Sequence, residues 1–130
     1  KLFDKILIDA PCSALGTLRK HPEGKWHKSV DTVWDKSKLQ RKMIDRALQL
    51  IKLDGELVYS VCSFELEEST DHLYWLLSTY KDKIEVIPCQ KRLPEYYKRF
   101  VTPDGQLMIY LSPKESMDGF SAFIIRKIKI

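Results

Sequence analysis

The stretch KILIDAPC, residues 5–12, decides the fold of this chain. Its isoleucine-rich start ends at a proline, which predicts a β-strand over 5–10 that is buried on both faces, as in a parallel sheet. Cys12 follows the proline at once. A second apolar run, ELVYSV at 56–61, is followed directly by Cys62. If these two strands are neighbours, both thiols face one crevice at the carboxyl edge of the sheet.

The segment between the two runs predicts a loop and a helix. Residues 11–35 contain two prolines and two glycines without a sustained apolar period, which is typical of a long loop. A loop of this length in a compact domain usually has a function. Residues 35–52 predict an amphipathic helix that stops near Gly55. Its apolar face is expected to comprise Leu39, Met43, Ala47, Leu48 and Ile51.

The remaining residues predict a second helix and three strands. Glu65, Glu67 and Glu68 are expected to open the helix, because acidic side chains complement the dipole at a helix N-terminus. A strand is predicted over 84–88. Two more, over 105–113 and 119–128, are expected to form an antiparallel hairpin at one edge of the sheet. The apolar face of the second helix is expected to comprise Leu73, Leu76, Leu77 and Tyr80.

Strand, helix, strand, helix, strand is the order of an α/β protein with a doubly wound parallel sheet. With 130 residues, 44% of them hydrophobic, the chain is one domain or a piece of one. It has no apolar run of membrane-spanning length and no signal-peptide layout, so we expect a soluble, cytoplasmic protein with no membrane partner. The three cysteines are odd in number and far apart, which argues against a disulfide framework and against a metal site.

The net charge of +4 is unevenly placed. From Arg19 to Arg46, nine Lys and Arg residues stand against four acidic residues. A second cluster, KRLPEYYKRF at 91–100, interleaves basic and aromatic side chains, a combination that suits phosphate contact and base stacking. A solvated face beside ordinary core aromatic residues explains the same pattern. The charge is therefore a hint of nucleic-acid binding and no more.

Free cysteines are usually small buried hydrophobic residues, and Cys89 fits that interpretation. Cys12 and Cys62 differ because both follow strand ends. A phosphatase-type loop would place an arginine six residues after its cysteine, but Leu18 and Glu68 stand at those positions. A cysteine hydrolase would need a histidine partner, and no spacing ties a histidine to either thiol. The available histidines are His21, His27 and His72.

Three segments together resemble the RNA cytosine-5 methyltransferases. DAPCSALGTLRKHPEGKW at 9–26 is similar to the family's Asp-Ala-Pro-Cys-Ser motif, and LVYSVCSFELEES at 57–69 is similar to its second cysteine motif. MDGFSAFIIRK at 117–127 resembles its closing strand. The order and spacing agree over nearly the whole chain, and the RKHPEGKW loop most resembles the bacterial branch that acts on small-subunit ribosomal RNA. The residues that depart from the usual motifs are Val61, Leu66, Ser69, Ser121 and Ala14.

The resemblance implies S-adenosylmethionine-dependent methylation of carbon 5 of cytosine in RNA, with ribosomal RNA as the expected substrate and transfer RNA as the alternative. It assigns Cys62 as the nucleophile that adds to carbon 6 of the base, and Cys12 to the release step. It places Asp9 between the methyl donor and the base, as a catalytic and cofactor-binding residue, and Pro11 beside the cofactor. The expected RNA-binding residues are Arg19, Lys20 and Lys25.

The family's catalytic domain is built on a Rossmann-like methyltransferase sheet whose early strands carry a glycine-rich turn for the donor. No such turn occurs here, and the chain enters its first strand directly from Lys1. We therefore expect residues 1–130 to be the carboxyl-terminal part of that domain, inactive in isolation and prone to self-association through an exposed strand edge. Two alternatives stay open: a noncatalytic RNA-binding relic of the same fold, and an unrelated cysteine hydrolase.

Overall fold

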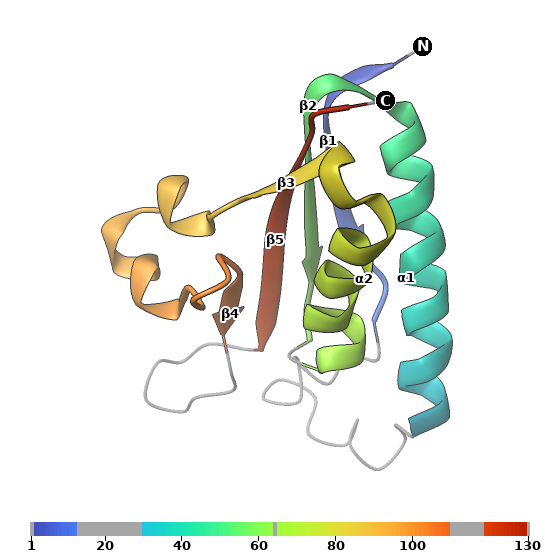
Figure 1. The fold of residues 1–130 in the computed structure, drawn as a ribbon. Coiled ribbons are helices and arrows are strands. Elements are labelled where there is room, and N and C mark those ends of the chain that lie inside the picture. Colours follow the sequence, from blue (N-terminus) through green and yellow to red (C-terminus); the bar gives the residue numbers. More distant parts are fainter. Residues whose placement is uncertain (1, 13–29, 64, 110–118, 130) are drawn as a thin grey trace.

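The structure is a computed structural model that describes residues 2–12, 30–63, 65–109 and 119–129. Within these ranges the chain forms a five-stranded sheet with two α-helices packed on one of its faces (Figure 1). Most of the loop predicted over 11–35 lies outside the described residues. The end of that range already belongs to the first helix.

Strands β1 (Phe3–Ala10) and β2 (Ile51–Val61) pair in parallel, as the sequence predicts for neighbouring strands joined by a crossover helix. The helix between them is α1 (Val30–Leu50), which starts earlier than expected. In the strand register Ala10 lies beside Val61, so both strands end at the same level. The chain therefore carries the two following cysteines to one edge of the sheet.

Strand β2 has no room for a side chain at Gly55. A Cβ atom there would lie 2.8 Å from the backbone oxygens of Asp4 and Lys52. The preceding Asp54 has a positive φ of 66°, and the register between β1 and β2 shifts at this point, between Phe3 and Lys5. The helix itself ends at Leu50, earlier than the predicted stop near Gly55, and Gly55 belongs to β2. The lack of a side chain at Gly55 lets β2 lie close against β1 at this irregularity.

Strand β1 lies at the edge of the described sheet and is buried on one face only, so the prediction of burial on both faces is wrong. Ile8 and Ala10 are buried, whereas Leu7 is 67% exposed and Asp9 is exposed. Alternate side chains of a strand point to opposite faces, so an all-apolar run does not itself reveal how many faces are covered. Self-association through this edge stays a prediction.

The last three strands are β3 (Ile84–Ile87), β4 (Leu107–Ile109) and β5 (Phe120–Lys127). β4 and β5 pair antiparallel, as predicted, and β4 lies at an edge of the sheet, because β5 is its only partner among the named strands. The strand order is β1-β2-β5-β3, with β5 antiparallel to both of its neighbours and β4 pairing with its first residues. Residues 121–125 of β5 are all buried, which is why this strand occupies the interior of the sheet.

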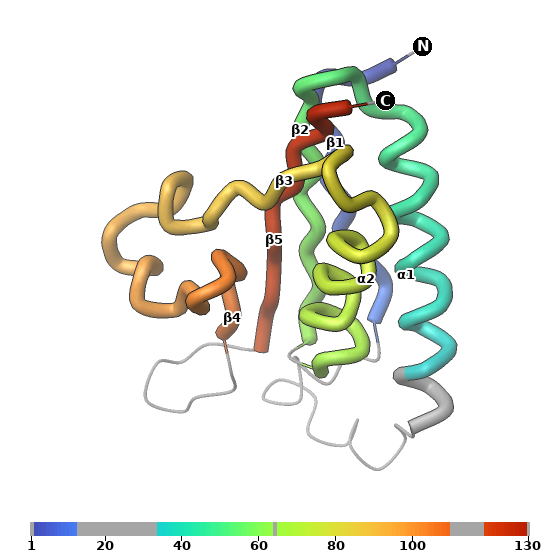
Figure 2. The backbone as a smooth tube through the Cα atoms, viewed as in Figure 1, coloured from blue at the N-terminus to red at the C-terminus, as the bar shows by residue number. Residues whose placement is uncertain are grey.

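Helices α1 and α2 (Thr70–Tyr80) cover one face of the sheet, over a core that includes Leu57 and Phe123. Part of the opposite face, around β5 and β4, is covered by an irregular stretch with two 3-10 turns, η5 (Cys89–Lys91) and η6 (Glu95–Phe100). We call residues 89–106 the outer segment. Figure 2 shows it on the far side of β5 from α1, and shows both chain ends opposite the end where β1 and β2 finish. Among the described helices, none is long and apolar enough to cross a bilayer.

Two expectations about the helices need correction. Leu39 was expected on the apolar face of α1 but is 42% exposed. The glutamates do not open α2: residues Leu66–Glu68 form a separate 3-10 turn, η3, and Asp71 is the acidic residue in the first turn of α2. From residue 34 onward, the buried residues of α1 are Ser37, Gln40, Ile44, Ala47 and Leu48. Glu68 is also fully buried, and these buried polar residues bear on the site described next.

Candidate active site

The two cysteines that follow β1 and β2 lie together, as the sequence predicts. The Sγ atom of Cys12 donates a hydrogen bond to the backbone oxygen of Cys62 over 3.5 Å, although the residues are 50 positions apart. Both side chains are partly buried, in contrast to Cys89, which is 3% exposed. Thiolates are the reactive form of cysteine, and partly accessible sites at strand ends are where such groups meet ligands.

The other predicted site residues are divided between this edge and the part of the chain that is not described. Asp9 lies beside Ser60 near the ends of β1 and β2, and its side chain is exposed, as is Pro11. The expected RNA-binding residues and two of the three histidines lie outside the described residues. They are Arg19, Lys20, Lys25, His21 and His27.

Behind the cysteines lies a buried carboxylate, Glu68. Its Oε2 atom accepts a hydrogen bond from Ser63 Oγ at 2.6 Å, and its Oε1 atom accepts one from Gln40 Nε2 at 3.3 Å. Its backbone oxygen accepts a 2.7 Å hydrogen bond from the hydroxyl of Tyr59. Because Ser63 directly follows Cys62, this side chain is tied to the loop that carries the second thiol. We name Glu68, Gln40 and His72 the buried polar network.

Gln40 joins this network to the loop of the first thiol. Its Nε2 atom also donates to the backbone oxygen of Pro11 over 2.7 Å, and Pro11 directly precedes Cys12. Its Oε1 atom lies 2.9 Å from Nε2 of His72. A single side chain on α1 therefore contacts the residue before Cys12 directly and reaches the residue after Cys62 through Glu68.

The protonation of His72 follows from its neighbours. Arg41 Nε lies 3.2 Å from its Nδ1 atom, and an arginine can only donate, so Nδ1 accepts and Nε2 carries the hydrogen that Gln40 receives. Burial, with the Arg41 charge as a second cause, lowers the pKa of His72 to about 4. The imidazole is therefore neutral at neutral pH, and neither ring nitrogen is left to activate a thiol. This disfavours a cysteine hydrolase built on His72.

The turn after Cys62 is fixed from several sides. Ser121 Oγ donates to the backbone oxygen of Ser63 at 2.7 Å, and the backbone nitrogen of Glu65 donates to Ser63 Oγ at 3.1 Å. Burial, with the neighbouring Glu67 and Glu68 charges as further causes, raises the pKa of Glu65. Tyr59 stacks on Phe123 with ring centroids 5.0 Å apart, so its hydroxyl is held toward this turn.

Sequence reasoning missed the buried polar network. A signal was present, because Gln40, Ile44, Ala47 and Ile51 recur at steps of four, three and four. This set of positions fits the helical period as well as the set that starts at Leu39. Because leucine is more apolar than glutamine, the sequence pattern favoured the set with Leu39 and placed Gln40 outside the core. Among the described residues, no group of three or more His, Cys, Asp or Glu side chains could hold a metal ion.

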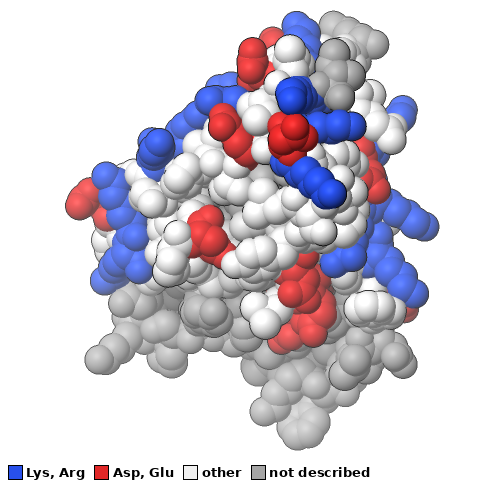
Figure 3. Space-filling model, viewed as in Figure 1, with Lys and Arg blue, Asp and Glu red and all other residues white. Residues whose placement is uncertain are grey.

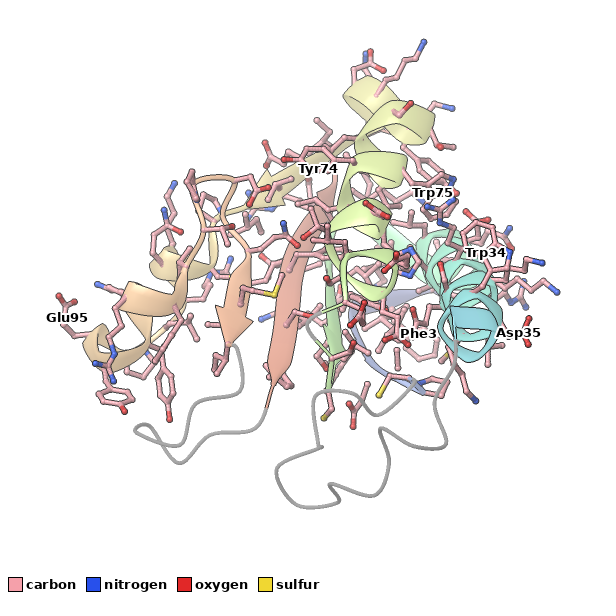
Figure 4. The ribbon with its side chains drawn as sticks, turned by 90° about the horizontal axis from the view of Figure 1, so that it is seen from below. Phe3, Trp34, Asp35, Tyr74, Trp75 and Glu95 are labelled. Atoms are coloured by element: carbon pink, nitrogen blue, oxygen red, sulfur yellow. The ribbon has the colours of Figure 1, made fainter. Side chains whose placement is uncertain are left out.

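The outer segment presents a different surface. Tyr96 and Tyr97 are 51% and 37% exposed, and the Arg99 guanidinium lies 4.4 Å from the ring centroid of Tyr96 and 4.8 Å from that of Phe100. Lys and Arg side chains gather over this segment and over α1, at the two sides of the view in Figure 3. In Figure 4 the labelled Glu95 of this segment lies far from Trp75, which sits between α2 and α1.

Comparison with known proteins shows the family to which this chain is similar. The family model for 16S rRNA methyltransferase RsmB/F matches residues 1–126. Ribosomal RNA small subunit methyltransferase F of Salmonella agona is 34% identical over 128 residues, which are 98% of this chain and 26% of the relative. The chain thus spans about a quarter of the length of the curated relatives it matches.

Solved structures of similar proteins share the fold of this chain. The crystal structure of PH0851 superposes with a TM-score of 0.81 at 31% identity, over 95% of this chain and 26% of that one. A methyltransferase homologue from Pyrococcus horikoshii gives 0.73 at 30% identity, over 97% of this chain and 39% of that one. The Rossmann-like fold and the family resemblance seen in the sequence are both confirmed. The chain belongs to the 16S rRNA methyltransferase RsmB/F family.

Proposed function

We propose that this chain supplies both cysteines of an S-adenosylmethionine-dependent methyltransferase that modifies carbon 5 of cytosine in ribosomal RNA. Residues 1–130 would be the carboxyl-terminal part of its catalytic domain. The observation that carries the proposal is the pairing of Cys12 and Cys62 at the ends of adjacent parallel strands, with the Sγ atom of one 3.5 Å from the backbone oxygen of the other.

Two neighbouring thiols suit this chemistry because carbon 5 of cytosine is a weak nucleophile. The Cys62 thiolate adds to carbon 6, which moves electron density onto carbon 5 and allows it to take the methyl group. Removal of the hydrogen from carbon 5 then lets the bond between sulfur and carbon 6 break and restores the double bond. Covalent catalysis of this kind splits one difficult step into easier ones.

Cys12 is proposed to serve the release step. Its sulfur lies beside the Cys62 loop, so a base covalently bound to Cys62 would bring its carbon 5 hydrogen near this second thiol. In thiolate form Cys12 takes the proton, and the electrons of the carbon–hydrogen bond form the new double bond as Cys62 leaves. A proton acceptor within hydrogen-bond reach of the reacting atom is the geometric requirement for such a step.

Two exposed residues at the end of β1, Asp9 and Pro11, are proposed to contact the methyl donor. The Asp9 carboxylate and the Pro11 ring are both exposed at the end of β1, so a ligand can reach them. In the proposed site they hold the donor between the strand end and the base, and Asp9 also accepts a hydrogen bond from the base. When bound, S-adenosylmethionine supplies the electrophilic methyl group.

RNA contact is proposed for two surfaces. Arg19, Lys20 and Lys25 carry the phosphate contacts that the sequence motif implies. The outer segment is the second surface, because its exposed tyrosines and stacked Arg99 offer aromatic faces and positive charge together. The target base must leave its stack, since carbon 6 is attacked from the ring face.

The test uses the complete polypeptide that contains these residues, with ribosomal RNA and methyl donor. Cys62→Ala should abolish methylation and form no covalent product. Cys12→Ala should still attack and transfer the methyl group, and should then stay attached to the RNA as a nuclease-sensitive shifted band on a denaturing gel. Cys89→Ala is the matched control, because Cys89 lies apart from the site in the opposite core cluster.

Each result separates the alternatives. A shifted band formed by Cys62→Ala, and not by Cys12→Ala, would show that the two roles are reversed. If neither variant forms a shifted band, the covalent mechanism is refuted. Full function without Cys62 would favour the noncatalytic relic. Bisulfite sequencing of the RNA product distinguishes methylation at carbon 5 from methylation elsewhere.

A further inference from the structure

We propose that Gln40 is a positioning residue that sets the separation of the two thiols. It does so by binding the peptide that leads into Cys12 while it is itself held by the network attached to the Cys62 loop. This inference rests on the proposed function, since it concerns the release step of that reaction.

The contact on the Cys12 side is direct. Gln40 Nε2 donates to the Pro11 oxygen at 2.7 Å, and that oxygen belongs to the peptide unit joining Pro11 to Cys12. The peptide unit is planar, so fixing its oxygen fixes the direction in which the Cys12 Cα atom leaves it. On its amino-terminal side this short stretch continues from the end of β1, two residues before Cys12.

The contact on the Cys62 side runs through Glu68. The same Gln40 nitrogen lies 3.3 Å from Glu68 Oε1, and Ser63 donates to Oε2 of that carboxylate at 2.6 Å. Ser63 follows Cys62 with no residue between them. The two NH bonds of one amide group therefore reach toward both loops, and α1 acts as the common support.

The orientation of the Gln40 amide is fixed by its third neighbour. His72 Nε2 lies 2.9 Å from Gln40 Oε1, and Arg41 holds the opposite ring nitrogen as an acceptor. If the amide turned over, its oxygen would face the Pro11 oxygen and the Glu68 carboxylate, and its nitrogen would face the hydrogen on His72. All three contacts would become repulsive, so a single orientation is stable.

Stability alone does not require this arrangement. A glutamine in a fully buried helical position gains little over an apolar residue of the same size, because its hydrogen bonds to water are lost on folding. A fully satisfied buried network does specify one geometry. The geometry specified here is the relation between the Pro11–Cys12 peptide and the Cys62–Ser63 turn.

The release step is the part of the reaction most sensitive to that relation. Attack on carbon 6 needs Cys62 and a bound base, whereas release needs Cys12 to reach carbon 5 of a base already fixed to Cys62. A displacement of about 1 Å can cost 10²-fold in rate at such a step. Loss of Gln40 should therefore slow release more than attack, and the covalent adduct should accumulate.

The experiment replaces Gln40 with methionine, which conserves volume and removes both polar atoms. In the complete polypeptide with RNA and methyl donor, Gln40→Met should transfer one methyl group per enzyme at nearly the normal rate. Its multiple-turnover rate should fall about 10- to 100-fold, and a shifted band should appear on the denaturing gel. Gln49→Met is the matched control, because Gln49 is an exposed glutamine on the same helix, and it should behave as the wild type.

Single-turnover transfer that falls in parallel with turnover, without a band, would show a general structural role and overturn the proposal. If Gln40→Met does not fold, the same gel assay is run with His72→Leu and His72→Gln. A glutamine at position 72 can still donate a hydrogen bond to Gln40 Oε1, whereas a leucine cannot. A band with leucine alone supports positioning, and a band with both or with neither overturns it. Cys12→Ala is run in parallel: if that variant forms no band, the proposed two-thiol mechanism itself fails.

Discussion

The buried polar network and the outer segment contain similar kinds of residues and use them differently. Gln40, Glu68 and His72 are fully buried, and each has hydrogen-bond partners at fixed distances. In the outer segment Tyr96 is half exposed, and Glu95 pairs with Lys98 at 3.0 Å while remaining 88% exposed. Both regions mix charge with aromatic rings, so composition does not distinguish them.

The difference lies in the access of water to each region. A buried polar group that loses its partner cannot turn to solvent, so the full cost of desolvation remains. An exposed ion pair that is broken is replaced by hydration, and its net contribution is small. The network therefore fixes geometry near the thiols, while the outer segment keeps its side chains available for a ligand. Four predictions test this contrast, from the largest expected effect to the smallest.

Replacing Glu68 should have the largest effect. Glu68→Ala leaves the buried donors of Ser63 and Gln40 without their acceptor and should lower the free energy of unfolding by about 3 kcal/mol. Glu95→Ala in the outer segment should have no measurable effect, since that carboxylate is solvated. Urea denaturation of both variants measures the difference. Equal destabilisation of the two would remove the distinction between the regions.

A matched pair of tyrosine hydroxyls contacts the two regions, one in each. Tyr59 donates to the Glu68 backbone oxygen at 2.7 Å in the core, and Tyr74 donates to Asp104 at 2.8 Å on the surface. Tyr59→Phe should cost about 1–2 kcal/mol of unfolding free energy, because a buried acceptor loses its donor. Tyr74→Phe should leave the unfolding midpoint unchanged. A larger loss with Tyr74→Phe would contradict the argument from burial.

Glu56 joins the sheet to the outer segment and should make stability depend on pH. Its carboxylate takes two 2.8 Å bonds from Arg92 and one of 3.2 Å from Arg126. The Arg92 hydrogen bonds, supported by Arg126, lower its pKa from 4.5 to about 2. A carboxyl group with a depressed folded-state pKa stabilises the protein above its unfolded value, and this contribution disappears as the pH falls from about 4.5 toward 2.

Glu56→Gln should therefore cost about 1 kcal/mol at pH 7, a value kept low because both arginines are partly solvated and the pair is screened. The cost should shrink steadily below pH 4.5, where the wild-type carboxyl group takes up its proton. Unfolding measured across this pH range provides the check. Glu85→Gln, at a more exposed carboxylate beside Arg126, is the control. A cost for Glu56→Gln that stays constant down to pH 2 would rule out this linkage.

The smallest effect on stability is expected for the exposed aromatic residues. Tyr96→Ala should change the unfolding midpoint very little, because half of the side chain is already in water. It should nevertheless weaken RNA binding by the complete polypeptide about 5-fold, through the loss of a stacking surface. Fluorescence anisotropy with a labelled ribosomal RNA fragment measures this, with Tyr74→Ala as the control. Unchanged affinity for Tyr96→Ala would exclude the outer segment from the RNA surface.

The sequence alone predicted much of the fold and the main pair at the site. The apolar runs that end at Pro11 and Cys62 predicted two parallel strands joined by a helix, because β-branched runs and helical periods are local signals. The antiparallel pairing of β4 with β5 at one edge of the sheet was also readable, but the place of β5 between β2 and β3 was not. Strand order depends on which faces become covered, and no local pattern records that.

What the sequence by itself determined was the class of fold and the meeting of Cys12 with Cys62, since parallel strands that pair must end at one edge. Only the tertiary structure decided that Gln40 faces inward in place of Leu39, that Glu68 turns away from solvent, and that both converge behind the thiols. The physical reason is that a buried polar residue is tolerable only when distant partners satisfy it. Those partners, Pro11 and Ser63 among them, are brought into place only by folding.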